Sequence, residues 1–194
     1  MGLVVRLGCR PRHRESRRIV TAARWLTDNE HLLPGAGDAL DVACGRGRNA
    51  RWLAARGLNT RAVDRDADLV RAVNEEAARL ALPLRADQVD LERGLVTLGA
   101  SAYDVIAVLH YLHRPLFPAL IDGLKPGGVL VYETFTRAQA ARGKPTNPAF
   151  LLESGELFQL VAPLEILARR EGDYEGRMIA GVVARRPLRD TGRM

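Results

Sequence analysis

The chain has 194 residues, of which 47% are hydrophobic and 27% charged, a balance typical of one globular domain. Its two cysteines, Cys9 and Cys44, provide neither a disulfide framework nor metal-ligand spacing, and no apolar run approaches the roughly 20 residues that cross a bilayer. A metal site and a membrane span are therefore not expected, and the formal net charge of +6, which comes almost entirely from arginine, identifies no partner by itself.

The N-terminal segment is basic. We expect residues 1–14 to form a basic, disordered tail, residues 15–186 one domain and residues 187–194 a C-terminal tail. The arginines of residues 10–18 favour a solvated segment, with a contact for anions or nucleic acid as the alternative. The apolar stretch at the start is too short for a signal peptide, which indicates a cytoplasmic protein.

Strands and helices alternate through the first half of the chain. Apolar residues at helical spacing predict a helix over residues 16–33, which ends at a Pro-Gly pair. The next elements are a strand over residues 39–43, a helix over 49–56, a strand over 59–63, a helix over 67–80 and a strand over 84–89. Units of strand, helix and strand are the motif from which parallel sheets are built.

The second half continues this alternation after a loop over residues 91–102. Residues 103–109 form a continuous apolar run, as expected of a strand covered on both faces. There follow a helix over residues 115–124, a tight turn over 125–128, a strand over 129–135, a polar segment over 137–148, a helix over 155–161 and a closing hairpin over 164–168 and 178–184. The sequence therefore predicts a single-domain α/β fold, with a doubly wound, mostly parallel sheet and helices on both faces.

Residues that follow the first four strands are expected to meet at one edge of the sheet, where open parallel sheets bind ligands. After the first strand, Gly45 and Gly47 permit a sharp turn and a close backbone approach, and the next helix offers amide donors. Asp64 ends the second strand, where a carboxylate can accept both hydroxyls of an adenosine ribose. The pattern predicts a cofactor that contains adenosine.

Two classes of cofactor fit this pattern. Gly45-x-Gly47-x-x-Ala50 followed by Asp64 also satisfies the dinucleotide fingerprint, so an NAD-type cofactor competes with S-adenosylmethionine. Asp41 favours S-adenosylmethionine, because its carboxylate would repel a pyrophosphate but attract the ammonium and sulfonium groups. An alternative role for Asp41, to tie down backbone amides of the loop, is compatible with either cofactor.

Five ordered motifs resemble those of the class I S-adenosylmethionine-dependent methyltransferases. They are LDVACGRGRN at residues 40–49, AVDR at 62–65, VDL at 89–91, YDVI at 103–106 and LKPGG at 124–128. The resemblance implies a Rossmann-like sheet of seven strands with an antiparallel last strand. It also implies that Asp64 binds the ribose and that Asp90 and Leu91 border the adenine.

Within this family, three stretches are similar to the tellurite-resistance methyltransferases. They are the Cys-Gly-x-Gly-Arg-Asn run at residues 44–49, the Asp-Leu pair at 90–91 and GEL at 155–157. Those enzymes carry a polar insertion with a His-Arg pair before the last strand, and here it is reduced to residues 172–177. This difference argues against tellurite itself as the methyl acceptor.

The candidate site residues follow from these positions. Cofactor binding is assigned to Asp41, Cys44, Gly45, Gly47, Asn49, Asp64, Arg65, Asp90, Leu91 and Leu109. His110 and Tyr111 are the catalytic candidates, because neutral imidazole can accept a proton near pH 7, with pocket lining or packing as their alternatives. Lys144 and Asn147 suit a flap over the acceptor site or a surface connection, and Glu133 is expected in a structural ion pair rather than on a substrate cation.

Three classes of function remain. The leading one is a methyltransferase that transfers a methyl group by in-line displacement to a small molecule, with metalloids and thiols among the candidate acceptors, as a monomer or homodimer. An RNA or DNA methyltransferase that uses the basic N-terminal region is less favoured, because aromatic residues make up only 5% of the chain. The third class is a cofactor-binding protein without catalysis.

Overall fold

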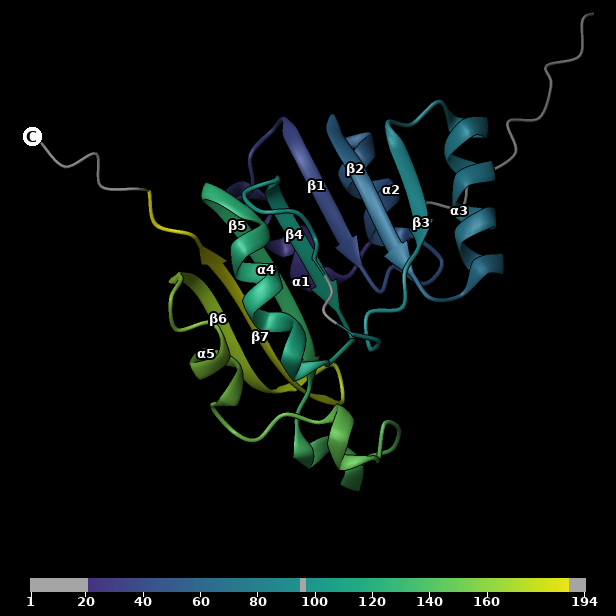
Figure 1. Ribbon diagram of the computed structural model, residues 1–194. Coiled ribbons are helices and arrows are strands. Elements are labelled where there is room, and N and C mark those ends of the chain that lie inside the picture. The colour runs from purple at the N-terminus through teal and green to yellow at the C-terminus, as the bar shows by residue number, and fades with distance from the viewer. Residues whose placement is uncertain (1–20, 95–96, 189–194) are drawn as a thin grey trace, which may run out of the picture.

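The computed structural model describes residues 21–94 and 97–188, which build one seven-stranded sheet with helices on both faces (Figure 1). The strands are β1 (Gly37–Val42), β2 (Leu58–Asp64), β3 (Leu84–Gln88), β4 (Tyr103–Leu109), β5 (Leu124–Phe135), β6 (Glu165–Tyr174) and β7 (Arg177–Arg185). Their order is β3-β2-β1-β4-β5-β7-β6, and β7 runs antiparallel to both of its neighbours while the other neighbouring pairs are parallel. The predicted doubly wound sheet with an antiparallel last strand is confirmed, whereas the tail expected over residues 1–14 lies outside the described residues.

Helices cover both faces of this sheet. One face carries α1 (Arg24–Asp28), α2 (Arg48–Ala55) and α3 (Ala67–Leu80), and the other carries α4 (Phe117–Gly123) and α5 (Glu156–Leu160) (Figure 1). Short 3-10 turns are η1 (Glu30–Leu32), η2 (Arg114–Leu116), η3 (Arg137–Ala141) and η4 (Pro148–Phe150). Among the described residues, no helix is both long and apolar enough to span a membrane.

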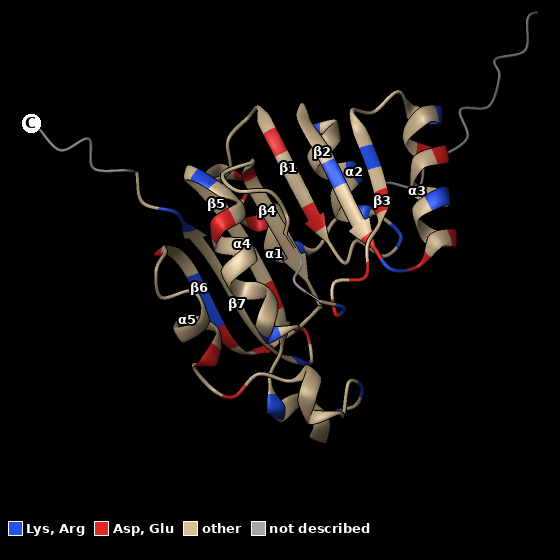
Figure 2. Cartoon of the chain, viewed as in Figure 1, with Lys and Arg blue, Asp and Glu red and all other residues tan. Residues whose placement is uncertain are grey.

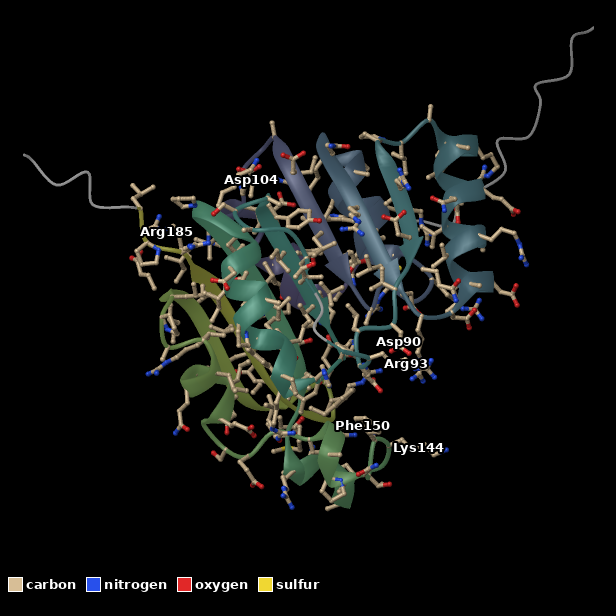
Figure 3. The ribbon with its side chains drawn as sticks, in the orientation of Figure 1. Asp90, Arg93, Asp104, Lys144, Phe150 and Arg185 are labelled. Carbon is tan, nitrogen blue, oxygen red and sulfur yellow. The ribbon has the colours of Figure 1, made fainter. Side chains whose placement is uncertain are left out.

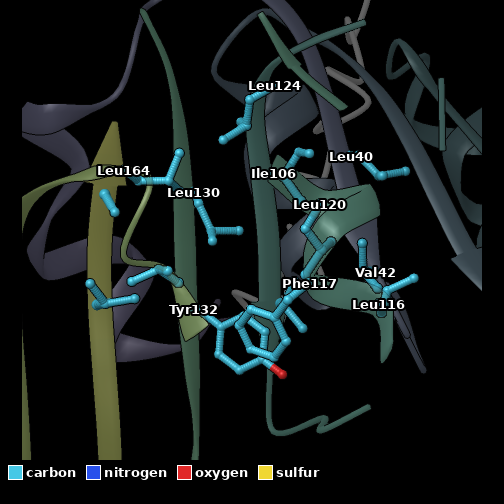
Figure 4. Close-up of a cluster of buried hydrophobic side chains, with 14 of the residues drawn as sticks. Leu40, Val42, Ile106, Leu116, Phe117, Leu120, Leu124, Leu130, Tyr132 and Leu164 are labelled. Carbon is cyan, nitrogen blue, oxygen red and sulfur yellow. The ribbon is translucent and has the colours of Figure 1, made fainter. Parts of the chain in front are cut away.

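Strand β4 shows how one sheet supports two cores. Side chains alternate along a strand, so Val105 packs in the layer of α1 and α2 while Ile106 packs in the layer of α4, and both are fully buried. In the α4 layer, the rings of Phe117 and Tyr132 stack with their centroids 5.0 Å apart (Figure 4). The strand predicted over residues 103–109 is confirmed residue for residue, because burial on both faces needs the continuous apolar run that the sequence has.

Helix α3 also has the predicted bounds. The Asp66 carboxylate accepts hydrogen bonds from the amides of Asp68 and Leu69, at 2.9 and 3.2 Å, and so caps the start of the helix. Its apolar stripe packs on the sheet, and its outer side carries both acidic and basic residues (Figure 2). The capping residue and the 3.6-residue period are local signals, which is why this helix is readable from sequence.

The N-terminal helix is shorter than the predicted residues 16–33, of which 16–20 lie outside the described part of the chain. From residue 21 onward the helix is limited to α1, followed by the separate turn η1. The side-chain amide of Asn29 donates to the carbonyl of Trp25 at 2.8 Å, which is the acceptor that a continuing helix would use. The periodic pattern was therefore overridden by a side chain that terminates the helix.

The tight turn predicted over residues 125–128 lies inside strand β5. Pairing with β4 steps from Leu124 to Val129 while β4 advances by two residues, so the segment bulges out of the ladder. The ammonium of Lys125 lies 2.7 Å from the carboxylate of Asp104, at the start of β4. The bulge and this ion pair fix the start of β5 against β4.

The closing hairpin is longer than predicted. Residues 172–177, interpreted as the remnant of an insertion, are the end of β6, a two-residue turn and the first residue of β7. Glu175 and Gly176 form the turn with φ angles of 55° and 77°, the left-handed conformation that tight hairpin turns require. The segment therefore extends the sheet and carries no additional lobe.

Candidate functional site

A cavity of about 400 Å³, which we call the first cavity, opens where strands β2, β3, β4 and β5 end. Six predicted site residues line it, namely Asp64, Arg65, Asp90, Leu91, His110 and Tyr111. Figure 3 shows Asp90 and Phe150, both lining residues, at one end of the molecule, while Asp104 lies at the opposite end. The parallel strands thus bring the residues after three successive strands into one wall, as predicted from their order.

The turn from β1 into α2 requires left-handed backbone. Ala43, Gly45 and Gly47 have φ angles of 52°, 54° and 67°, which end the strand one residue before its predicted end. A Cβ atom on Gly47 would lie 2.7 Å from Cγ2 of Val73, whereas a Cβ on Gly45 would have no neighbour within 4 Å. Gly47 therefore serves both backbone conformation and close packing on α3, while Gly45 serves the backbone alone.

Asp64 joins the second strand to this turn. Its Oδ2 accepts a hydrogen bond from the amide of Gly45 at 2.7 Å, and its Oδ1 accepts one from the amide of Asp66 at 3.1 Å. Each carboxylate oxygen has two lone pairs, so acceptor capacity remains for a ligand in the first cavity. The carboxylate is held in place by backbone amides before any ligand binds.

Asp41 and Asn49 lie behind the turn. The buried Asp41 carboxylate accepts a hydrogen bond from the amide of Ala50 at 2.9 Å, and burial raises its pKa to about 7. The side-chain carbonyl of Asn49 accepts from the amide of Ala23 at 2.9 Å and so ties the N-terminal segment to α2. Neither residue lines the first cavity, so the structure gives Asp41 the loop-organising role that was its alternative interpretation.

Cys44 and Leu109, two further cofactor-binding candidates, pack against the protein interior. The Cys44 thiol is buried and its pKa is raised above the usual range by desolvation and by the nearby Asp41. Leu109 belongs to the hydrophobic layer of α1 and α2. The structure does not place these side chains in the cavity wall, and a thiol held protonated is unsuited to nucleophilic catalysis.

His110 follows β4 in a left-handed conformation with φ of 62°, and its amide donates to the carbonyl of Glu133 at 2.7 Å. The ring stacks on Phe135, with centroids 5.3 Å apart, and Nδ1 lies 3.3 Å from Nη2 of Arg48. Since a guanidinium only donates, Nδ1 is the acceptor and the proton of the neutral ring is on Nε2. Burial and then the positive charge of Arg48 lower the pKa of His110 to about 4.

Tyr111 lines the first cavity with a hydroxyl that is buried and has no hydrogen-bond partner among the described residues. Burial, followed by the charge of Glu92, raises its pKa to about 12, so the hydroxyl keeps its proton. A buried hydroxyl without a partner costs about 1 to 3 kcal/mol. The geometry therefore leaves a hydrogen-bond donor that a ligand can satisfy.

A larger cavity of about 730 Å³, the second cavity, lies on the other side of His110, which lines both. Four arginines contribute to its wall, namely Arg24, Arg48, Arg170 and Arg177. Arg48, Arg170 and Arg177 were not assigned to the site from the sequence. Arg48 follows the glycine turn directly, a signal that was readable, whereas Arg170 and Arg177 reach the site only through the pairing of the final hairpin.

Glu133 and Arg170 form the buried ion pair expected for Glu133. Nε of Arg170 donates to Oε2 at 2.9 Å, and the guanidinium lies 4.5 Å from the ring centroids of both Trp25 and Tyr174. Burial raises the pKa of Glu133 and the charge of Arg170 opposes that rise. The network links α1, β5 and β6 around the second cavity.

The segment predicted as a flap contributes Pro145 and Phe150 to the wall of the first cavity. Lys144 and Asn147, the two residues assigned to the flap, do not line it. The side chain of Asn147 instead accepts from the amide of Ala149 at 3.0 Å and caps η4. The segment borders the cavity through apolar side chains, and its polar residues shape the backbone or face outward.

Comparison with known proteins finds matches for this chain. The methyltransferase domain family matches residues 39–128. Hemagglutinin 1 from Eikenella corrodens is 31% identical over 153 residues, which is 72% of this chain. The chain spans 50% of the length of that protein.

Solved structures share the fold over most of the chain. The S-adenosylmethionine-dependent methyltransferase from Mesorhizobium loti has a TM-score of 0.68 at 17% identity, covering 86% of this chain and 100% of that one. The geranyl diphosphate C-methyltransferase from Streptomyces coelicolor, solved with S-adenosyl-L-homocysteine, has a TM-score of 0.66 at 15% identity, covering 84% and 78%. TehB from Haemophilus influenzae has a TM-score of 0.64 at 19% identity, covering 84% and 61%.

Proposed function

Since the chain carries a methyltransferase domain on the fold of S-adenosylmethionine-dependent enzymes, we propose that it binds S-adenosylmethionine and methylates a small molecule. The cofactor would lie in the first cavity and the acceptor would enter through the second. The observation that carries this assignment is that His110 lines both cavities. A group shared by two adjoining cavities marks the place where two substrates can meet.

The first cavity fits the adenosine part of the cofactor. Asp64 is held by two backbone amides with acceptor capacity left for the ribose hydroxyls, and Asp90 and Leu91 border the same wall. The unpartnered hydroxyl of Tyr111 is a donor for a nitrogen or oxygen of the ligand. Glu92 and Arg65 add polar groups at the mouth, so the cavity suits a polar aromatic nucleoside.

The arrangement disfavours an NAD-type cofactor. Dinucleotides place their pyrophosphate against amides of the glycine turn. Here the amide of Gly45 donates to the carboxylate of Asp64, 2.7 Å away. This amide is therefore not free for a pyrophosphate, and the carboxylate beside it would repel one. The turn from β1 into α2 therefore supports a cofactor without a pyrophosphate.

When bound, S-adenosylmethionine supplies a methyl group on a positively charged sulfur. An acceptor attacks the methyl carbon in line and displaces the sulfur. We assign to His110 a positioning role, rather than the role of a base, at the point where the two cavities adjoin, which we call the junction. Its Nδ1 lone pair faces Arg48, and its lowered pKa of about 4 makes it a weak proton acceptor at neutral pH. Catalysis would then rest on orientation, with an acceptor atom that is already deprotonated or needs no deprotonation.

Similarity to the tellurite-resistance branch rests on the motifs at residues 44–49, 90–91 and 155–157. The segment 172–177 forms a hairpin turn with no lobe, and it contributes Arg177 to the second cavity. We therefore keep oxyanions of metalloids in the group of candidate acceptors, together with thiols, without preferring tellurite.

Calorimetric titration of the purified chain with S-adenosylmethionine, S-adenosylhomocysteine and NAD tests the cofactor. Binding of the first two, but not of NAD, is expected; tight NAD binding with no response to the other two would overturn the proposal. Methyl transfer from radiolabelled cofactor to a panel of thiols, selenite, tellurite and transfer RNA then tests the acceptor class. Transfer to the RNA alone would contradict a small-molecule acceptor.

A further inference from the structure

The second cavity holds more positive charge than its own carboxylates balance. Arg24 forms an ion pair with Glu175, and Arg170 pairs with Glu133. For Arg48 and Arg177, no carboxylate lies within 4.0 Å among residues 21–94 and 97–188.

The charges of Arg48 and Arg177 both act on His110. Nη2 of Arg48 lies 3.3 Å from Nδ1 of His110, and Arg177 lines the same cavity from the start of β7. Both charges oppose protonation of His110, as does Arg170. Oε1 of Glu133 lies 3.7 Å from Nε2 of His110, and the same carboxylate is engaged by Arg170 through Oε2. The wall holds four arginines and three carboxylates, those of Asp28, Glu133 and Glu175, so one positive charge remains in excess.

We propose that Arg48 and Arg177 bind an anionic group of the methyl acceptor, a carboxylate, a phosphate or a related oxyanion. The guanidinium group suits this task because its planar fork donates two parallel hydrogen bonds to such anions. The anion would replace the missing counter-charge, and the reacting atom of the acceptor would lie beside His110. This inference rests on the proposed function, because it names the acceptor of that methyl transfer.

A bound anion in this place also fits the absence of a strong base at the junction. Two arginines stabilise the deprotonated form of a nearby acidic group, such as a thiol or a carboxyl. The acceptor can then enter as an anion, with its proton already lost to solvent. The methyl carbon bonds to the acceptor atom, the bond to the sulfonium sulfur breaks with its electron pair, and S-adenosylhomocysteine leaves.

The test uses the whole chain saturated with S-adenosylhomocysteine. Inorganic phosphate and benzoate, in separate titrations, are the probes, and amide NMR signals report their dissociation constants. We compare the wild type with R48Q, R177Q and the matched control R185Q, which changes an arginine at the far end of β7 (Figure 3). Melting curves of all four proteins identify any variant that fails to fold, and R48K then replaces R48Q.

We expect at least one probe to bind the wild type and R185Q equally, and to bind R48Q and R177Q about tenfold or more weakly, as for loss of a hydrogen bond to a charged group. Absence of saturable shifts with both probes overturns the inference, as does binding that neither variant weakens. The affinity for S-adenosylhomocysteine is measured beforehand and tests the proposed function separately. If the wild type does not bind it, the proposed function fails; if the variants weaken it while phosphate and benzoate binding is unchanged, the arginines hold the cofactor's carboxylate and the acceptor assignment is overturned.

Discussion

The carboxylate of Asp64 has two tasks in this structure. It accepts hydrogen bonds from the amides of Gly45 and Asp66, and it lines the cavity assigned to the cofactor. Truncation of a residue with both tasks should lower stability and ligand affinity together.

We expect D64A to weaken binding of S-adenosylhomocysteine by roughly tenfold or more, because a charge-assisted hydrogen bond to a ribose hydroxyl contributes about 1.5 to 3 kcal/mol. The cofactor-free protein should also lose about 1 to 2 kcal/mol of stability from the two amide contacts. Calorimetry and urea denaturation measure the two effects. D64N, which keeps one acceptor oxygen, should restore part of the stability without the affinity; unchanged affinity in a folded D64A would remove Asp64 from the binding site.

His110 gives the protein a pH dependence below neutrality. Its pKa is 6.5 in an ordinary setting and about 4 here, so the unfolded chain takes up a proton that the folded protein refuses between these values. The free energy of unfolding should therefore fall as pH drops from 6.5 to 4, by up to about 3 kcal/mol from this residue. Because the pKa of Asp41 is raised, that carboxylate acts in the opposite direction over the same range.

The contribution of His110 is isolated by comparing the wild type with H110Q in urea denaturation at pH 7 and pH 5. H110Q should lose less stability than the wild type over this interval, since glutamine does not titrate. An equal loss in the two proteins would mean that the fold does not lower the pKa of His110.

Residues of the site differ in how far sequence predicts them. The acids and the His-Tyr pair could be predicted to lie together because they follow strands whose ends meet in any open parallel sheet. Arg170 and Arg177 were missed because they stand in a hairpin, where an arginine in sequence resembles any solvated charge. Their approach to His110 depends on the pairing of β5 with β7, which no local pattern specifies.

At the scale of elements, the turn between β1 and α2 depends on two glycines for different reasons. Gly45 and Gly47 both have a left-handed backbone. A Cβ on Gly47 would collide with Val73, whereas a Cβ on Gly45 would meet no atom within 4 Å. G45A should therefore cost about 1 kcal/mol, the backbone penalty of a left-handed residue. G47A adds overpacking against α3 and should cost roughly 2 to 4 kcal/mol in total.

Chemical denaturation of G45A, G47A and the double variant G47A/V73A measures this difference. The double variant removes the methyl groups that the new Cβ would strike, so it should recover part of the cost of G47A relative to V73A. Equal losses in G45A and G47A would show that α3 moves away freely, and close packing at this turn would not be a constraint.

Elements with strong periodic or capping signals were predicted closely. Helix α3 has its own cap and period, and β4 has a continuous apolar run. The N-terminal helix is ended by a local hydrogen bond from the side chain of Asn29, and the bulge in β5 depends on pairing with β4. Apolar periodicity reports neither a single side-chain hydrogen bond nor the pairing of distant strands.

At the scale of the whole molecule, one sheet joins the half that carries the glycine turn to the half that carries the final hairpin. Strands β1 and β2, which carry the glycine turn and Asp64, connect through β4 and β5 to the hairpin that carries Arg177. The number of strands and the antiparallel last strand were implied by the family resemblance. The strand order was not predicted, since alternation of strands and helices limits a fold to a class but does not order the strands. The continuous sheet predicts that both halves unfold together.

Thermal unfolding tests in one measurement whether both halves unfold together and which cofactor binds. A ligand that binds the folded state at a concentration of 100 times its dissociation constant stabilises it by about 2.7 kcal/mol. For a domain of this size each kcal/mol shifts the melting temperature by about 2 to 4 °C, so S-adenosylhomocysteine should raise a single transition by about 5 to 10 °C. NAD at the same concentration should leave it unchanged. If the ligand raises only the first of two transitions, the hairpin half unfolds separately, and the two cavities that share His110 would not belong to one cooperative unit.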